Sequence, residues 1–129
     1  MPRLLNTALD SVMPHVISAT ELELLQFFEV KPSTNDPDSP WDYNDWLYQV
    51  SVQGIHLTFS IAPAYKDVRL MIYLENRVLY ELISIGVEDV VFHESPDREV
   101  LEIRLTERNR LFLQLRPQIE ITQQLSERQ

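Results

Sequence analysis

Cysteine is absent from the 129-residue sequence, and glycine occurs only twice. Without cysteine the chain has no disulfide framework, no thiolate zinc site and no cysteine nucleophile. Two glycines are too few for a glycine-rich loop that binds phosphate. No apolar run reaches the roughly 18–20 residues that span a bilayer, and the first residues lack the apolar region of a signal peptide. We therefore expect a cytoplasmic protein that does not contact membranes. The absence of cysteine agrees with such a reducing compartment.

Basic residues are also scarce, and they are unevenly placed. The chain carries 11 lysines and arginines against 20 acidic residues, which gives a net charge of −9. Residues 1–45 contain eight acidic residues but only Arg3 and Lys31, and no lysine or arginine lies between Lys31 and Lys66. Such a surface repels phosphate backbones, so we expect no nucleic acid partner. A basic protein would instead be attracted to it.

The length of the chain and its hydrophobic content of 44% indicate one globular domain, residues 1–129, with a core of its own. Apolar positions near the N-terminus show no regular period, and Pro14 interrupts any helix there. Changes in periodicity and charge along the sequence divide it into five segments. These are an arm or short helix at 1–17, a helix at 18–31, an acidic and aromatic loop at 32–45, an antiparallel sheet at 46–121 and a polar tail at 122–129.

The helix prediction depends on the residues at its two ends. Thr20 is a suitable N-cap, and Glu21 and Glu23 lie in the first turn, where acidic residues favour the positive end of a helix. Pro32 cannot continue a helix. The pattern therefore predicts a helix over 20–29. Alternating apolar residues in the same stretch leave a strand as the alternative.

From residue 46 onward apolar residues alternate with polar ones, which is the period of half-buried strands. The run at 78–85 is almost continuously apolar and is predicted to be buried on both faces. Short connections between strands indicate antiparallel neighbours. We therefore predict an α+β fold, mainly β, with the N-terminal helix packed on a curved antiparallel meander of about six to seven strands; closure into a barrel is the alternative. The strands are expected at 46–52, 55–61, 68–74, 78–85, 87–94, 101–105 and 111–115, with an edge segment at 119–121.

The most unusual stretch is residues 32–46, PSTNDPDSPWDYNDW, which contains four aspartates, three prolines, two tryptophans and a tyrosine. Asp36, Asp38 and Asp42 have the spacing of the first, third and seventh positions of a calcium-binding EF-hand loop. That loop requires glycine at its sixth position and glutamate at its twelfth, where this chain has Trp41 and Leu47. The sequence therefore predicts no metal site here.

Catalytic motifs are missing as well. His15, His56 and His93 have no HxH or HExxH spacing, and there is no G-x-S-x-G sequence around a nucleophile. Arginines gather around the last predicted hairpin, where cross-strand ion pairs with acidic residues account for them. The acidic residues of this group are Glu99, Glu102 and Glu107. We expect neither an enzyme nor a bound cofactor.

Recognition of another protein fits the acidic and aromatic loop better. Tryptophan and tyrosine supply large, rigid contact areas, acidic residues steer a basic partner, and prolines reduce the entropy that the loop loses on binding. Trp46 and Tyr48 fall in the inward register of the first strand, whereas Trp41 and Tyr43 suit either a lid on the core or a contact surface. The predicted partner-binding residues are Asp36, Asp38, Trp41, Asp42, Tyr43 and Asp45.

The leading hypothesis is a non-enzymatic protein-binding module. Small size, acidic composition, absence of cysteine and a single domain are typical of immunity proteins and antitoxins, which inhibit a basic toxin. The first alternative is a small-molecule-binding or enzymatic domain with a pocket inside the sheet, lined by residues such as Tyr65, Tyr80, His56 or His93. The second is a structural or assembly subunit whose oligomer face contains Phe112, Leu79 or Ile83. The oligomeric state does not follow from the sequence.

Overall fold

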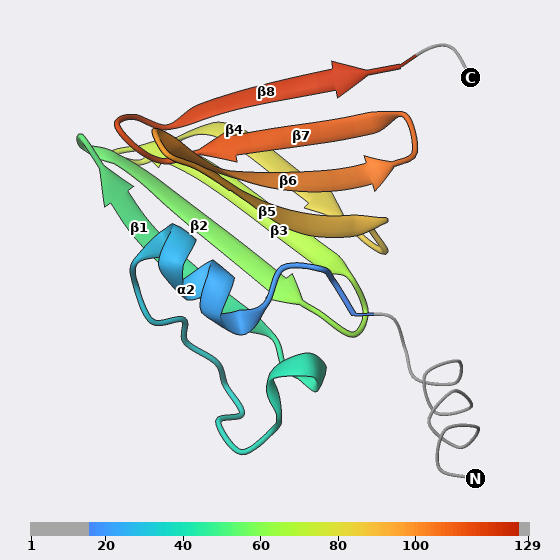
Figure 1. Ribbon diagram of the computed structural model, residues 1–129. Helices are drawn as coiled ribbons and strands as arrows, with labels where there is room; N and C mark the ends of the chain where they lie inside the picture. The colour runs from blue at the N-terminus through green and yellow to red at the C-terminus, as the bar shows by residue number, and fades with distance from the viewer. Residues whose placement is uncertain (1–15, 127–129) are drawn as a thin grey trace, which may run out of the picture.

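The computed structural model describes residues 16–126 and contains eight strands in two antiparallel sheets (Figure 1). Strands follow one another in each sheet in the order of the sequence, so both sheets are meanders. The first sheet consists of β1 (Trp46–Val52), β2 (Ile55–Ala62), β3 (Asp67–Leu74) and β4 (Arg77–Ser84). The second consists of β5 (Asp89–Ser95), β6 (Arg98–Thr106), β7 (Asn109–Gln114) and β8 (Glu120–Leu125).

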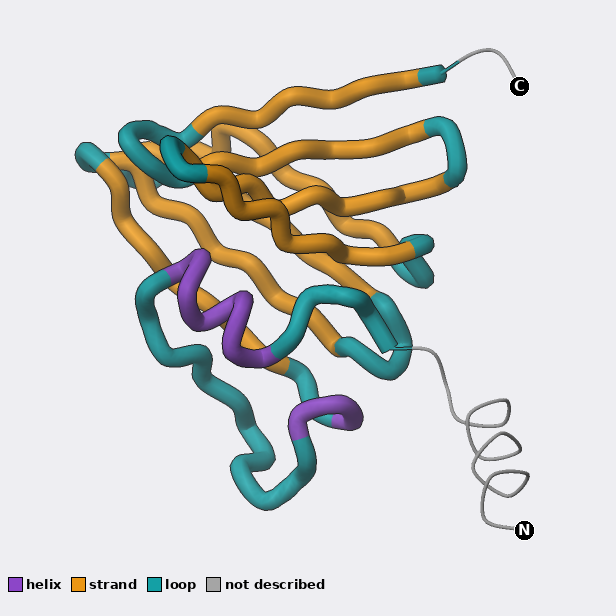
Figure 2. Tube along the Cα trace, in the orientation of Figure 1, coloured by secondary structure: helices purple, strands orange, loops and turns teal. Residues whose placement is uncertain are grey.

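The prediction of a mainly β fold with an N-terminal helix is confirmed. Two differences concern the sheet: there are eight strands rather than six or seven, and they form two open sheets rather than one curved sheet or a barrel. The helix, α2 (Glu21–Phe28), precedes a loop that contains one turn of 3-10 helix, η1 (Trp41–Tyr43) (Figure 2). No helix within residues 16–126 is long and apolar enough to cross a bilayer.

The start of α2 is stabilised by a capping box. The Thr20 side chain accepts a hydrogen bond from the backbone N–H of Glu23 (3.1 Å), and the Glu23 carboxylate accepts one from the backbone N–H of Thr20 (3.0 Å). Two helix N–H groups that have no partner within the helix are thereby satisfied. The helix ends at Glu29, which adopts a left-handed conformation (φ 59°). The predicted helix and its N-cap are therefore confirmed, and the strand alternative is wrong.

One hydrophobic core joins the two sheets and the helix. Alternate residues of β2, β6 and β7 point into it, as the period of two predicts. Phe28 of α2 stacks on Tyr48 of β1 and on Phe59 of β2, with ring centroids 4.6 Å and 5.2 Å apart. Because α2 also contacts β5 and β6, it closes one side of the space between the sheets. Each such buried aromatic side chain contributes about 1.5–3 kcal/mol through the hydrophobic effect.

The chain changes from the first sheet to the second just after β4. Gly86 adopts a left-handed conformation (φ 70°), which glycine tolerates better than other residues, and Val87 is buried directly after it. Because β5 begins a new sheet, β4 stays an edge strand with one unpaired side. The prediction that 78–85 is buried on both faces is wrong, since Leu79, Ile83 and Ile85 are exposed.

The two ends of the chain bring a second correction. The predicted polar tail begins at residue 122, but β8 continues to Leu125 and pairs with β7 along its length. An edge strand needs mainly backbone hydrogen bonds, so polar side chains do not prevent it. Most of the predicted arm at 1–17 lies outside the described residues, as do 127–129. At the described start of the chain, Ala19 donates a backbone hydrogen bond to Val90 of β5 (2.8 Å).

Candidate functional site

The acidic and aromatic loop is held in shape by a buried amide, Asn44, whose exposed fraction is 7%. Its Nδ2 donates to the backbone carbonyls of Asp36 (2.7 Å) and Ser39 (3.2 Å). Its Oδ1 accepts from the Thr34 hydroxyl (2.5 Å) and from the backbone N–H of Asp45 (2.8 Å). One side chain therefore joins both arms of the loop. The composition of the stretch did not single out Asn44, because a buried asparagine and an exposed one look alike in a sequence.

The aromatic residues of the loop divide between the core and the surface. Trp41 stacks on Trp46, with ring centroids 5.3 Å apart, and the Trp46 indole N–H donates to the Trp41 carbonyl (3.1 Å). Both tryptophans are half-buried and pack against the core. Tyr43, in contrast, is 52% exposed. Of the two roles open to these residues, Trp41 has that of a lid on the core and Tyr43 lies on the surface.

The four predicted aspartates share the loop but not one point in it. Asp36, Asp38 and Asp45 are exposed, and Asp42 is half-buried. One carboxylate oxygen of Asp36 accepts a hydrogen bond from the Ser39 hydroxyl, within the loop itself. Within residues 16–126 no group of three histidine or acidic side chains is arranged to hold a metal ion.

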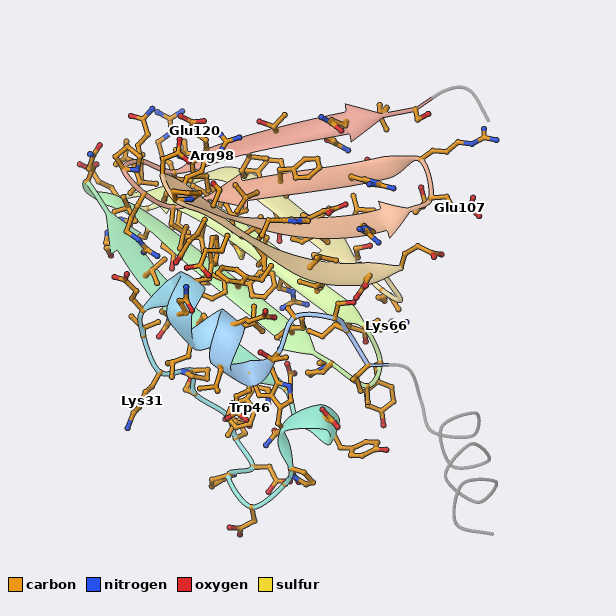
Figure 3. The ribbon with its side chains drawn as sticks, viewed as in Figure 1. Lys31, Trp46, Lys66, Arg98, Glu107 and Glu120 are labelled. Atoms are coloured by element: carbon orange, nitrogen blue, oxygen red, sulfur yellow. The ribbon has the colours of Figure 1, made fainter. Side chains whose placement is uncertain are left out.

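Asp42 and Asp45 belong to a larger surface at one end of the sandwich, which we call the acidic end. It consists of three connecting segments: residues 41–45, 63–67 and 84–88. Hydrogen bonds join each segment to the next, so the end is one continuous surface; Figure 3 labels Lys66, which belongs to the second segment. The bonds are Ala64 N to Asp42 O (2.8 Å), Val87 N to Lys66 O (2.8 Å) and Gly86 N to Asp67 Oδ1 (3.0 Å).

Large apolar side chains project from the acidic end between carboxylates. Tyr43 is 52%, Tyr65 69% and Ile85 82% exposed. Ile85 and Asp45 line the same shallow hollow, of about 270 Å³, on the outer face of the first sheet. Exposed aromatic and aliphatic residues that are grouped and bordered by charge are typical of protein contact surfaces. Sequence reasoning assigned Tyr65 only to the alternative pocket and did not single out Ile85, because their neighbours in this surface come from distant segments.

The alternative pocket inside the sheet is not assembled. His56 lies on the outer face of the first sheet, with its Nδ1 2.6 Å from the Ser51 hydroxyl. His93 lies on the outer face of the second sheet, and Tyr65 is exposed in a turn. Tyr80 is half-buried against the core, where burial raises the pKa of its hydroxyl. These four side chains therefore do not converge, and the space between the sheets is filled by the core.

The chemically richest cluster lies on the outer face of the second sheet and surrounds Glu102, whose side chain is 2% exposed. Its Oε1 accepts from Nε2 of His93 (2.7 Å), and its Oε2 contacts Nε of Arg104 (2.9 Å) and Nη1 of Arg110 (3.3 Å). The predicted cross-strand pairing of Glu102 with arginine is thereby confirmed. Burial alone would raise the pKa of Glu102, but hydrogen bonds from Arg104 and His93 outweigh it and lower this pKa below its ordinary value. A carboxylate with both oxygens occupied and a lowered pKa is poorly suited to act as a general base.

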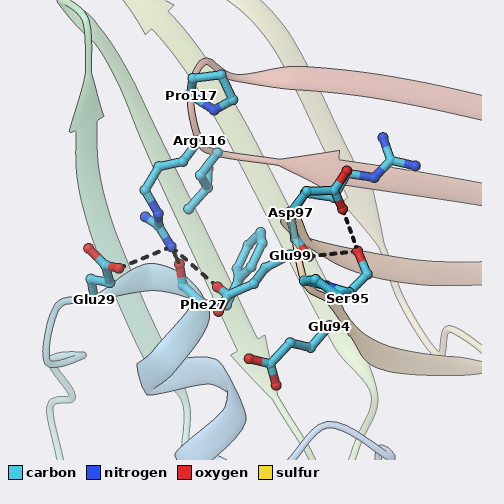
Figure 4. A pocket seen from close by; sticks show the side chains of 11 residues that line it. Phe27, Glu29, Glu94, Ser95, Asp97, Glu99, Arg116 and Pro117 are labelled. Atoms are coloured by element: carbon cyan, nitrogen blue, oxygen red, sulfur yellow. Dashed lines mark hydrogen bonds and ion pairs between the residues drawn. The ribbon is translucent and has the colours of Figure 1, made fainter.

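A further hollow, of about 410 Å³, lies where the end of α2 meets the turns after β5 and β7 (Figure 4). The Arg116 guanidinium points into this junction. Its Nη2 donates to the carbonyl of Phe27 (2.5 Å) and lies 3.5 Å from the carboxylates of Glu29 and Glu99. A cation at the C-terminal end of a helix stabilises its free carbonyl groups. This cluster therefore joins the helix to the second sheet.

Comparison with known proteins gives one informative result. No protein-family model matches the chain, and no curated protein matches its sequence. Among solved structures, it is similar to a chain of "Contact-dependent growth inhibition toxin - immunity protein complex from Klebsiella pneumoniae 342", with a TM-score of 0.68 and 20% identity. The match covers 84% of this chain and 97% of that one. The two chains share a fold.

Proposed function

We propose that this chain is an immunity-type protein, which binds a protein toxin and keeps it inactive without catalysing a reaction itself. The observation that carries the proposal is the fold shared over 84% of the chain with a component of a toxin–immunity complex. That complex contains both a toxin and an immunity protein. The net charge of −9 favours the immunity role over that of a toxin that acts on a polyanion, because such a surface repels phosphate groups. Both oxygens of Glu102 are engaged in hydrogen bonds, which makes this carboxylate a poor catalytic base.

The acidic end supports the proposal as the surface that meets the toxin. Tyr43, Tyr65 and Ile85 offer exposed apolar area, and burying such groups contributes most of the affinity of protein interfaces. Asp42 lies in the same turn as Tyr43, Asp45 lines the same hollow as Ile85, and their negative charge accelerates association with a basic partner. Asp36 and Asp38 lie further out in the loop and serve long-range attraction. The buried amide of Asn44 holds the loop in place before binding, so little entropy is lost on association.

The test begins with capture of partners from the source cells by the tagged chain, at low and at moderate salt. The captured protein is identified by mass spectrometry and expressed alone in a test bacterium, in the cytoplasm, where we propose that the chain acts. We expect its expression to arrest growth and co-expression of this chain to restore it. A captured protein that leaves growth unchanged, or an arrest that this chain does not relieve, would refute the proposed function.

A charge-reversed variant locates the surface in the same assay. Substitution of Asp42→Lys together with Asp45→Lys should leave folding nearly intact, because surface substitutions of this kind change stability by about 0.5 kcal/mol or less each. It should weaken capture and protection, most strongly at low salt, where surface electrostatics act furthest. Glu75→Lys together with Glu120→Lys, at exposed positions outside the acidic end, is the matched control. Equal loss of protection in both variants would show that only net charge matters.

A further inference from the structure

The outer face of the second sheet contains a hollow of about 390 Å³, which we call the arginine hollow. Its floor is apolar, formed by Val100 of β6 and Phe112 of β7. Three arginines border it, and Glu102 lies beneath them with its side chain 2% exposed. The arginines are Arg98, Arg104 and Arg110. In a chain with a net charge of −9, this is a local concentration of positive charge.

Only part of the hydrogen-bonding capacity of these arginines is used. Arg104 contacts Glu102 through Nε and Arg110 through Nη1, so each guanidinium keeps other N–H groups. Within residues 16–126 the side chain of Arg98 makes no hydrogen bond or ion pair. The second glutamate at the rim, Glu94, accepts a hydrogen bond from Gln26 of the helix (2.9 Å). Three arginines and two glutamates line the hollow, Asp89 lies beside Arg104 at its edge, and the arginines keep unused N–H donors.

Glu102 is more deeply buried than a glutamate in a solvent-exposed cross-strand ion pair needs to be. Burying a carboxylate costs several kcal/mol, which its partners offset only when the geometry is favourable, and apolar residues are often as stable in the same place. The buried carboxylate does, however, fix the positions of two arginine side chains. It holds Arg104 and Arg110, which repel each other, side by side over an apolar floor. An arrangement of this kind is prepared for a carboxylate, which two guanidinium groups bind through paired hydrogen bonds.

The arginine hollow is continuous with the acidic end. The backbone N–H of Glu88, in the acidic end, donates to the carbonyl of Arg104 (2.7 Å). Glu88 and Asp89 line a neighbouring hollow of about 350 Å³ together with Arg104 and Arg110. A protein bound to the acidic end reaches the arginines where its contact continues over Glu88 and Asp89 onto the outer face of the second sheet. The partner would then meet negative charge at the acidic end and positive charge at the arginine hollow.

We propose that the arginine hollow receives an aspartate or glutamate side chain of the toxin, whose carboxylate binds Arg104 and Arg110 while its methylene groups contact Val100 and Phe112. This inference rests on the proposed function and adds a second, oppositely charged contact to it. Charges of alternating sign across an interface fix the orientation of the partner and exclude partners that are merely basic. The hollow thus acts in selecting the toxin, and the acidic end in attracting it.

The decisive measurement is calorimetric titration of the toxin with variants of this chain at constant salt. Arg110→Gln removes one guanidinium, and Arg77→Gln, at an exposed position of β4, makes the same change of charge away from the hollow. We expect Arg110→Gln to weaken binding about tenfold or more and Arg77→Gln about twofold or less. Equal affinities of the two variants would overturn the inference. If Arg110→Gln does not fold, Arg110→Lys, which keeps a positive charge beside Glu102 but loses the paired donors of the guanidinium, takes its place with the same expectation.

A second measurement separates failure of this inference from failure of the proposed function. Sodium glutarate, a small dicarboxylate, is titrated into the free protein at constant ionic strength, and amide signals of β6 and β7 are followed by NMR. We expect shifts around the hollow in the wild type that are lost in Arg110→Gln. Such shifts would support the carboxylate site even if the captured protein is no toxin. A toxin that is neutralised normally by Arg110→Gln, with no shift on addition of glutarate, would overturn the site and leave the proposed function standing.

Discussion

The acidic end and the arginine hollow are neighbouring charged surfaces that are built in opposite ways. At the acidic end, hydrogen bonds join three connecting segments, and the carboxylates of Asp45 and Glu88 are exposed while those of Asp42 and Asp67 are half-buried. In the hollow, regular strands supply the backbone, and side chains are joined through one buried carboxylate. Like charges in loops can separate and are screened by salt, so they need no counter-charge. Arg104 and Arg110 are direct neighbours on adjacent strands, and Glu102 contacts both of them.

The largest expected effect comes from removing the amide that organises the loop. Asn44→Ala should lower the free energy of unfolding by about 2–3 kcal/mol, because four hydrogen bonds of a buried side chain are lost at about 1 kcal/mol each and water replaces part of them. Binding of the toxin should weaken, while the hollow should keep its glutarate response. Urea denaturation measures the stability, and Asn35→Ala, in the same loop but exposed, is the control. A change below 0.5 kcal/mol would show that the loop does not depend on Asn44.

The converse variant disrupts the hollow and leaves the acidic end intact. Glu102→Gln should cost about 1–3 kcal/mol at neutral pH, since charge-assisted hydrogen bonds are lost, and no more, because Arg104 and Arg110 are partly exposed and can be hydrated. Exposed Glu107→Gln is the control. A variant as stable as the wild type would mean that the cluster contributes nothing.

The same residue predicts a dependence on pH. The pKa of Glu102 is lowered in the folded protein, so its contribution is fully present above the ordinary value of 4.5 and is lost as the pH falls through the folded pKa. The stability difference between wild type and Glu102→Gln should therefore shrink at acidic pH. Denaturation curves between pH 7 and pH 3 measure it, and a difference that is constant over this range would contradict the lowered pKa.

A smaller effect of opposite sign is expected in the core. The Tyr48 hydroxyl is buried without a hydrogen-bond partner among residues 16–126, so Tyr48→Phe should raise stability by up to about 1 kcal/mol. Burial, together with the charge of Glu21, raises the pKa of Tyr48. Its neutral form is therefore favoured by folding, and the wild type should lose stability above pH 10, where the unfolded tyrosine ionises, more than the variant does. Thermal unfolding checks both, with Tyr65→Phe as the exposed control.

The smallest expected effect on stability is that of Ile85→Ser, which tests whether Ile85 belongs to a contact surface. Ile85 is 82% exposed, so Ile85→Ser should change the free energy of unfolding by about 0.5 kcal/mol or less. Its effect on toxin binding should be much larger, because an exposed apolar residue at an interface is buried only in the complex. Calorimetry measures the affinity for the toxin, and Leu125→Ser, at an exposed position at the end of β8, is the control. Unchanged affinity would remove Ile85 from the contact surface.

The periodicity of the sequence was sufficient for most of the secondary structure. Alternating residues predicted the strands and their inward faces because a strand buries every second residue whatever sheet it joins. The end signals of the helix were also local, and Thr20 caps it as expected. The partition into two sheets was not predictable in this way. Whether β5 pairs with β4 depends on the turn at Gly86 and on the competition of all strands for the core.

The candidate site shows the same limit. The acidic and aromatic composition of residues 32–45 marked a surface, but the burial of Asn44 and the positions of Tyr65 and Ile85 near this loop became visible only in the folded structure. The sequence predicted an ion pair between Glu102 and arginine but not the burial of its carboxylate, because its alternation with apolar neighbours is that of an exposed residue. The pairing of β5 and β7 with β6 brings His93 and Arg110 next to Glu102, beside Arg104 of the same strand.

The sequence alone thus determined the charge, the strands, the helix with its cap and the absence of cysteine chemistry. These properties follow from composition and from interactions between residues a few positions apart, and they do not change when the strands are arranged differently. The tertiary structure decided the rest: two sheets instead of one, an exposed β4, a loop held by one buried amide and arginines positioned by one buried carboxylate. The sheet partition depends on contacts between residues far apart in the chain, and the contacts of Asn44 and Glu102, though nearer in sequence, depend on the burial that the folded structure gives these two side chains.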